Sequence, residues 1–171
     1  MANQKLNLDL GALHDAIIAQ IKAAFPALVT VQDYPLDRKT PRVPACIIEC
    51  DEMEGVTAED PGTGQQALDL RFGARLILPF RTPAAGRSIR ILATSFAGLV
   101  HENRWGQPID PAEVIGCYPD AFDPELDQYL VWRVEWRQVG HFGQTNWADH
   151  VYPPAPPPSG LMFHHAWPEA E

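Results

Sequence analysis

Apolar residues recur every three or four positions over residues 10–25, in the segment LGALHDAIIAQIKAAF. This spacing predicts an amphipathic helix with one buried face. Asp9 or Asn7 can cap its start, and Pro26 marks its end. His14 lies beside the apolar stripe, and we expect it to be a flanking surface residue rather than a catalyst, since no partner for it can be named.

Two segments alternate with the period of two that is typical of β-strands. In residues 67–80 (ALDLRFGARLILPF) every second residue from Leu68 to Leu78 is apolar, and Asp69, Arg71, Gly73 and Arg75 lie between them. In residues 130–137 (LVWRVEWR) Trp132 and Trp136 share a face with Leu130. We expect antiparallel strands with one solvent-exposed face. The charged residues of the solvent-exposed faces are Asp69, Arg71, Arg75, Arg133, Glu135 and Arg137.

Weaker patterns predict the remaining elements. Residues 84–103 have helical spacing, and short strands are expected around residues 29–31 and 114–118. Residues 45–56 (ACIIECDEMEGV) begin apolar and become acidic, like a buried strand that emerges at its far end. Clustered carboxylates can bind metal or perform acid–base chemistry, but a solvated strand end is the simpler interpretation. The acids concerned are Glu49, Asp51, Glu52 and Glu54.

The order of these elements predicts an α+β fold, with a mostly antiparallel sheet and two helices packed on one face. We expect one domain over residues 1–143 and an extended Pro-rich C-terminal arm over residues 144–171. Five prolines in six residues favour polyproline conformation there. Leu161, Phe163 and Trp167 follow the prolines and make the arm too apolar for a solvated tail. We expect it to dock on another surface, such as a neighbouring subunit.

The charge balance narrows the choice of partners. The 171 residues include 13 Lys and Arg against 22 Asp and Glu, so the formal net charge is −9. A protein that binds DNA normally carries a basic patch. An acidic surface instead repels the phosphates and lets DNA pass without adhering. Three cysteines are too few for a disulfide scaffold and lack zinc-site spacing. We expect buried free thiols.

Motifs of catalysis and cofactor binding are missing from the sequence. It contains no GxSxG, HExxH, Walker or GxGxxG pattern, so no catalytic, cofactor-binding or metal-binding residue is assigned. The start does not resemble a signal peptide, and no apolar stretch approaches the roughly 20 residues that span a bilayer. We therefore expect a protein made in the cytoplasm without membrane partners, and not an enzyme.

Five segments together resemble the tail terminator (tail completion) proteins of lambda-like and Mu-like long-tailed bacteriophages. The resemblance covers about residues 8–142. Its closing segment carries the most weight, because a short acidic loop running into a Trp-rich strand is typical of how such proteins end. The segments are LHDAIIAQIKAAFP, PACIIEC, ALDLRFGARLIL, RILATSFAGLVHENRW and CYPDAFDPELDQYLVWRVEWRQ.

The resemblance implies a structural virion protein that forms a hexameric ring on the head-proximal end of the tail tube. Such a ring stops tube polymerisation, offers a surface to the neck (head–tail connector) proteins, and lets genome DNA pass without specific binding. Head-to-tail subunits need two different contact patches. The residues expected to contact another subunit or the tube are Arg71, Arg75, Arg133, Glu135, Arg137, Leu161, Phe163 and Trp167.

Other interpretations stay open at this point. Another neck or connector subunit, or a tail-tube subunit, belongs to the same structural class. A small α+β enzyme or ligand-binding domain belongs to a different one, and would be a monomer or dimer with a pocket lined by titratable groups.

Overall fold

The computed structural model describes residues 7–34, 42–120 and 129–144. The Pro-rich arm, with Leu161, Phe163 and Trp167, lies outside these residues, so its predicted docking stays a prediction. The elements in chain order are α1 (Leu10–Ala24), β1 (Thr30–Asp33), β2 (Ala45–Gly55), the short 3-10 helix η1 (Thr57–Glu59), β3 (Gln66–Pro79), α2 (Ala85–Val100), β4 (Glu113–Pro119) and β5 (Tyr129–Phe142).

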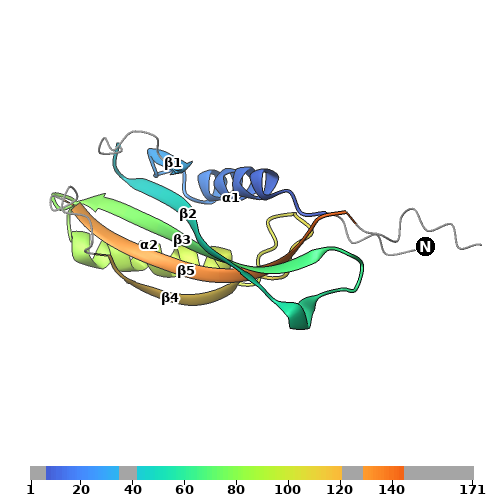
Figure 1. Cartoon of the computed structure of the whole chain (residues 1–171). Coiled ribbons are helices and arrows are strands. Elements are labelled where there is room, and N and C mark those ends of the chain that lie inside the picture. The colour runs from blue at the N-terminus through green and yellow to red at the C-terminus, as the bar shows by residue number, and fades with distance from the viewer. Residues whose placement is uncertain (1–6, 35–41, 121–128, 145–171) are drawn as a thin grey trace, which may run out of the picture.

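The five described strands form one sheet in the order β1-β2-β3-β5-β4. All neighbouring pairs are antiparallel except β1 and β2, which are parallel. The two longest strands, β3 and β5, lie in the centre and pair along their whole length, from Gln66 with Phe142 to Pro79 with Tyr129. The predicted α+β class with a mostly antiparallel sheet is confirmed (Figure 1).

Both helices pack on the same face of the sheet. The predicted stripe of α1 is buried there, and its start is capped by Asp9, whose Oδ1 accepts a hydrogen bond from the Ala12 N–H at 3.1 Å. Phe25, which follows α1, stacks on Phe96 of α2 with ring centroids 5.8 Å apart. The core cluster includes Leu13, Ile17, Ile21, Leu70, Phe72, Ala74, Leu76, Ile89, Ala93, Phe96, Val100, Val134 and Trp136.

The alternation of β3 and β5 divides their side chains as predicted. Trp136 lies on the helix-covered face, stacked on Phe72 with ring centroids 5.4 Å apart and tilted against Trp105 at 6.2 Å. Trp132 lies on the same face and is partly buried. β5 continues to Phe142, beyond the predicted residues 130–137, because β3 pairs with it to the end. The opposite face is described below as the charged face.

Two expectations about buried side chains are corrected. His14 is not a flanking surface residue: it is buried, because the rings of Tyr34 and Phe72 pack on it at 5.4 and 5.6 Å. Among the cysteines, only Cys46 is fully buried, whereas Cys50 and Cys117 are half-buried. All three are free thiols, and burial raises the pKa of the Cys50 thiol to about 11.

The acidic stretch after residue 48 is the solvated end of a buried strand, as expected, since residues 45–48 are buried and residues 51–55 are exposed. β2 runs on to Gly55 and pairs with β3 through the whole stretch. The turn between β2 and β3, including η1, projects beyond the helices, at the lower right of Figure 1. We call residues 51–66 the acidic hairpin, because they hold five Asp or Glu and no Lys or Arg.

Candidate functional site: the charged face of the sheet

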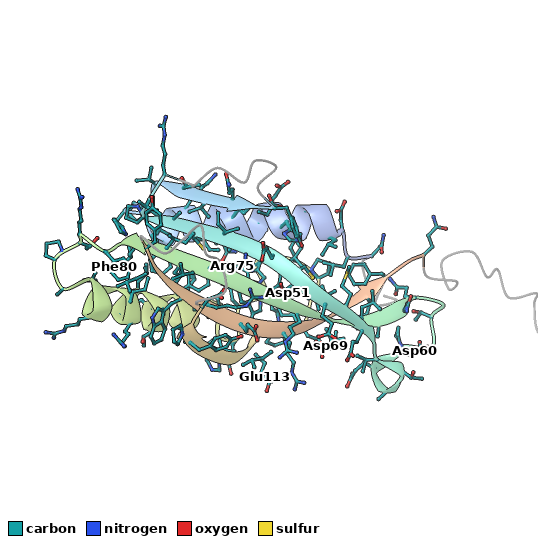
Figure 2. The ribbon with its side chains drawn as sticks, turned by 60° about the vertical axis from the view of Figure 1, so that its left-hand side comes forward. Asp51, Asp60, Asp69, Arg75, Phe80 and Glu113 are labelled. Atoms are coloured by element: carbon teal, nitrogen blue, oxygen red, sulfur yellow. The ribbon has the colours of Figure 1, made fainter. Side chains whose placement is uncertain are left out.

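The face of the sheet that the helices leave open carries most of the predicted site residues. Arg71 and Arg75 of β3 and Arg133, Glu135 and Arg137 of β5 all lie on it, as the alternation predicts. Side chains of β2 and β4 join them from either side, so that the charges form a band across four strands (Figure 2).

Arginines face each other across the two central strands. In the register of β3 and β5, Arg75 lies opposite Arg133 and Arg71 lies opposite Arg137. Like charges directly opposite each other destabilise a sheet unless they are neutralised. Between the two pairs lies Glu135, opposite Gly73, and it contacts Arg133 at 2.9 Å and Arg71 at 3.6 Å.

Carboxylates from the flanking segments complete the neutralisation. Arg75 contacts Glu49 of β2 at 3.3 Å and Asp120, just after β4, at 3.1 Å. Arg137 contacts Glu113 of β4 at 2.8 Å. The ion-pair network of the described residues thus joins four arginines to seven carboxylates, which leaves a formal charge of −3; these carboxylates are Glu49, Asp51, Glu52, Asp69, Glu113, Asp120 and Glu135.

Arg133 is the most buried of these arginines, with 9% of its surface exposed. Its guanidinium crosses the backbone of Gly73 to reach Asp51 of β2. A Cβ atom at position 73 would lie 2.6 Å from the Arg133 Cζ and 2.8 Å from the Asp51 Oδ2, so only glycine leaves room for this ion pair. Asp51 itself sits at a β-bulge, where the register with β3 shifts between Cys50 and Glu52. The bulge presents Asp51 in addition to the regular acidic positions of the strand.

The central groups keep their charges over a wide pH range. Burial alone would lower the pKa of the Arg133 guanidinium, but the hydrogen bonds and charges of Asp51 and Glu135 raise it overall. Burial alone would raise the pKa of the Glu135 carboxyl, but hydrogen bonds with Tyr118 and Arg133 and the charges of Arg133 and Arg71 lower it overall. Burial, followed by the hydrogen bond to Glu135, raises the pKa of Tyr118 to about 12. Near neutral pH, Arg133 and Glu135 are therefore charged and Tyr118 is neutral, an arrangement suited to a structural role.

A shallow depression of about 410 Å³ opens at the end of the band near β4. Its residues are Glu52, Asp69, Arg71, Glu113, Val114, Ile115 and Arg137. Ile115 is 45% exposed at the rim of this depression, on the edge strand β4. An apolar side chain surrounded by ion pairs is typical of a polar contact surface rather than of a ligand pocket, which is mostly apolar.

The structure brings the five predicted charged residues together on one face of the sheet. Each of the four arginines pairs with acids of its own chain. Their contact with a second subunit or a tube stays a prediction. Sequence reasoning did not find Gly73 and Asp51 as parts of the network; a lone glycine between two arginines in an alternating strand was the available signal.

Within the described parts of the chain, no three His, Cys, Asp or Glu residues are grouped so as to hold a metal ion. Neither described helix has the length and apolar character needed to cross a membrane. In comparisons with known proteins, the chain matches no protein-family model and no curated protein.

Proposed function

We propose that this protein is a structural subunit of the tail terminator type. In this role it forms a ring that caps the head-proximal end of a phage tail tube, stops tube polymerisation and offers a surface for neck attachment. The proposal rests on the resemblance of residues 8–142 to this family, and the α+β fold agrees with the fold which that resemblance implies. A fold alone does not define a function, so the charged face has to support the proposal.

The observation that carries the proposal is the composition of the charged face. Its four arginines are tied to seven carboxylates, so the arginines are occupied and the surface as a whole is acidic. A surface of this kind repels phosphates instead of binding them. This suits a protein that lines or borders a channel for DNA, or one that presents a rigid charged surface to a protein partner.

The decisive experiment is to image the purified full-length protein by negative-stain electron microscopy and to measure its mass by light scattering. Closed rings of uniform mass that do not elongate support the proposal. Rings that also arrest the growth of tail-tube subunits would separate a terminator from a connector. Filaments of indefinite length would instead indicate a tail-tube subunit. A monodisperse monomer that binds a small molecule would contradict the proposal and favour the ligand-binding alternative.

A further inference from the structure

Basic side chains that form no ion pair with a described residue gather at one helix. Arg81, Arg87 and Arg90 lie just before or within α2 and are exposed, and none forms an ion pair with a described residue. Arg90 instead donates a hydrogen bond to the Gly86 carbonyl and packs over the ring of Trp132, 5.2 Å from its centroid. α2 itself contains two arginines and no acidic residue, which is unusual in a chain of net charge −9. The outer surface of α2 is therefore a basic patch on an acidic protein.

This patch also has an apolar centre. Ile91 is 57% exposed, and it lies in a shallow depression of about 470 Å³ whose other residues are Arg87, Arg90, Thr94 and Ser95. The N-cap of α2 is Ala84, which has no side chain that can accept a hydrogen bond from the first turn. Acidic groups near this end would therefore interact favourably with the helix dipole as well as with the arginines.

Acidic side chains gather on the acidic hairpin. Asp51 and Glu52, near its base, belong to the network of the charged face. Farther out, Glu54 and Glu59 are exposed, and neither forms an ion pair with another described residue. Between these two groups of acids, Met53 is 54% exposed. The hairpin thus presents exposed carboxylates and one flexible apolar side chain, which are the counterparts of the exposed arginines and of Ile91.

The two surfaces lie apart within one molecule. In Figure 2, Asp60 of the hairpin lies at one end of the sheet and Phe80, which precedes α2, lies at the other. Figure 1 shows the same separation between the β2–β3 turn and α2. A projecting segment that matches a distant patch of the same chain can reach that patch only on a second copy, which makes a head-to-tail contact.

We propose that the acidic hairpin of one copy docks on the outer face of α2 of the next copy. Glu54 and Glu59 pair with Arg87 and Arg90, and the contact continues around the whole assembly. The occupant of the α2 face is thus a second copy of this chain. The inference rests on the proposed ring, since it names the contact that joins its subunits.

The test reverses the charge of each surface separately. Arg87→Glu with Arg90→Glu makes the α2 patch acidic, and Glu54→Lys with Glu59→Lys makes the hairpin basic. Each double variant alone then presents like charges at every contact. We expect each to remain monomeric in light scattering and sedimentation, at concentrations at which the unaltered full-length protein assembles.

Mixing the two variants supplies the decisive result. In a mixture, the acidic hairpin of the first variant meets the basic α2 of the second, and the basic hairpin of the second meets the acidic α2 of the first. Every contact is complementary again, so we expect assembly to return with the two chains in equal amounts. This recovery also shows that both variants are folded. Assembly should weaken as salt is raised above about 0.15 M, because salt screens exposed charges.

Matched controls change charge on other surfaces by the same amount. Lys22→Glu with Arg42→Glu imitates the α2 variant, and Asp15→Lys with Glu102→Lys imitates the hairpin variant; all four residues are exposed. We expect both controls to assemble like the unaltered protein.

The outcomes separate this inference from the proposed function. If the unaltered protein forms rings and the double variants form them equally well, the hairpin contact is wrong and the ring stands. If assembly needs the α2 arginines and residues 153–171 but not the hairpin acids, the arm is the occupant and the inference is wrong. If mixed variants restore rings that never cap a tube, the contact is supported and the terminator role is contradicted. If they restore only dimers, the contact does not continue around an assembly and the inference is wrong.

Discussion

Gln138 and Trp105 form a hydrogen bond inside the core, with the Trp105 Nε1–H donating to the Gln138 Oε1 at 2.8 Å. The same amide donates from Nε2 to the backbone carbonyls of Asn103 and Asp110 at 3.0 and 2.8 Å. Gln138 is only 2% exposed, yet its donors and its acceptor are used. This one side chain therefore fixes the loop after α2 to the centre of β5.

We expect Gln138→Leu to destabilise the protein by about 3 kcal/mol or more. The substitution removes the acceptor of the buried Trp105 and Trp136 indole N–H groups and the donor to the Asp110 carbonyl, while the Asn103 carbonyl still accepts from the Ala112 N–H. Each buried group left without a partner costs about 1–3 kcal/mol. Chemical denaturation followed by tryptophan fluorescence measures the free energy of unfolding. Gln66→Leu, at an exposed position in β3, serves as the control and should change it by less than about 0.5 kcal/mol. Equal effects of the two changes would contradict a special role for Gln138.

A second prediction concerns Gly73, where the Arg133 guanidinium occupies the space that a Cβ atom would fill. Gly73→Ala places a methyl group 2.6 Å from the Arg133 Cζ, so the guanidinium must leave its position and lose Asp51. We expect a loss of about 1–3 kcal/mol, as for a broken partly buried charged hydrogen bond. Gly98→Ala is the matched control, because a Cβ there meets nothing within 4 Å. Gly98 lies in α2, where alanine is favoured over glycine, so this change should stabilise the protein by up to about 1 kcal/mol.

A double-mutant cycle isolates the cause of the Gly73 effect. In a chain that already carries Arg133→Gln, the shorter side chain does not cross position 73, and the cost of Gly73→Ala should fall by at least half. If the cost is the same in both backgrounds, then backbone strain rather than the displaced guanidinium explains it.

Features that depend on local sequence patterns could be predicted, whereas features that depend on contacts between residues far apart in the sequence could not. The faces of β3 and β5 follow from a period of two and one buried face, so the positions of Trp136 and Arg133 were predictable. The Arg133–Asp51 pair joins residues 82 positions apart and depends on a bulge, and neither the register nor the bulge leaves a local pattern. Likewise, Gln138 occupies a core-facing position as a polar residue, and its partners come from a loop with no periodicity.

The free thiols provide a third prediction. Burial raises the pKa of all three cysteines, and only the thiolate reacts quickly with alkylating agents. At pH 8, we expect Cys46, which is fully buried, to stay unmodified by iodoacetamide in the native protein. Cys50, with a pKa of about 11, should react slowly. Peptide mass spectrometry gives the rate at each site, and all three rates should converge in denaturant. Rapid native labelling of Cys46 would contradict its burial.

His14 gives a prediction about pH. Burial lowers the pKa of its imidazole below the ordinary value of 6.5, although the nearby charges of Asp33 and Asp15 partly oppose this. The Asp33 carboxylate lies 3.6 Å from the His14 Nδ1, and among described residues this nitrogen has no hydrogen-bond partner. As pH falls below 6.5, the unfolded chain takes up a proton that the folded chain resists. The contribution of neutral His14 is therefore complete above pH 6.5 and is lost as pH falls toward the folded pKa.

His14→Phe removes this titration while it keeps an aromatic ring beside Tyr34 and Phe72. Thermal unfolding at pH 7.5, 6.5 and 5.5 compares the variant with the unaltered protein. We expect the unaltered protein to lose stability relative to His14→Phe as pH falls, because only its folding is coupled to the His14 proton. His101→Gln is the control for the removal of a histidine, since His101 is exposed at the end of α2. If the unaltered protein instead gains stability relative to His14→Phe on acidification, then the ion pair of protonated His14 with Asp33 outweighs the cost of burial.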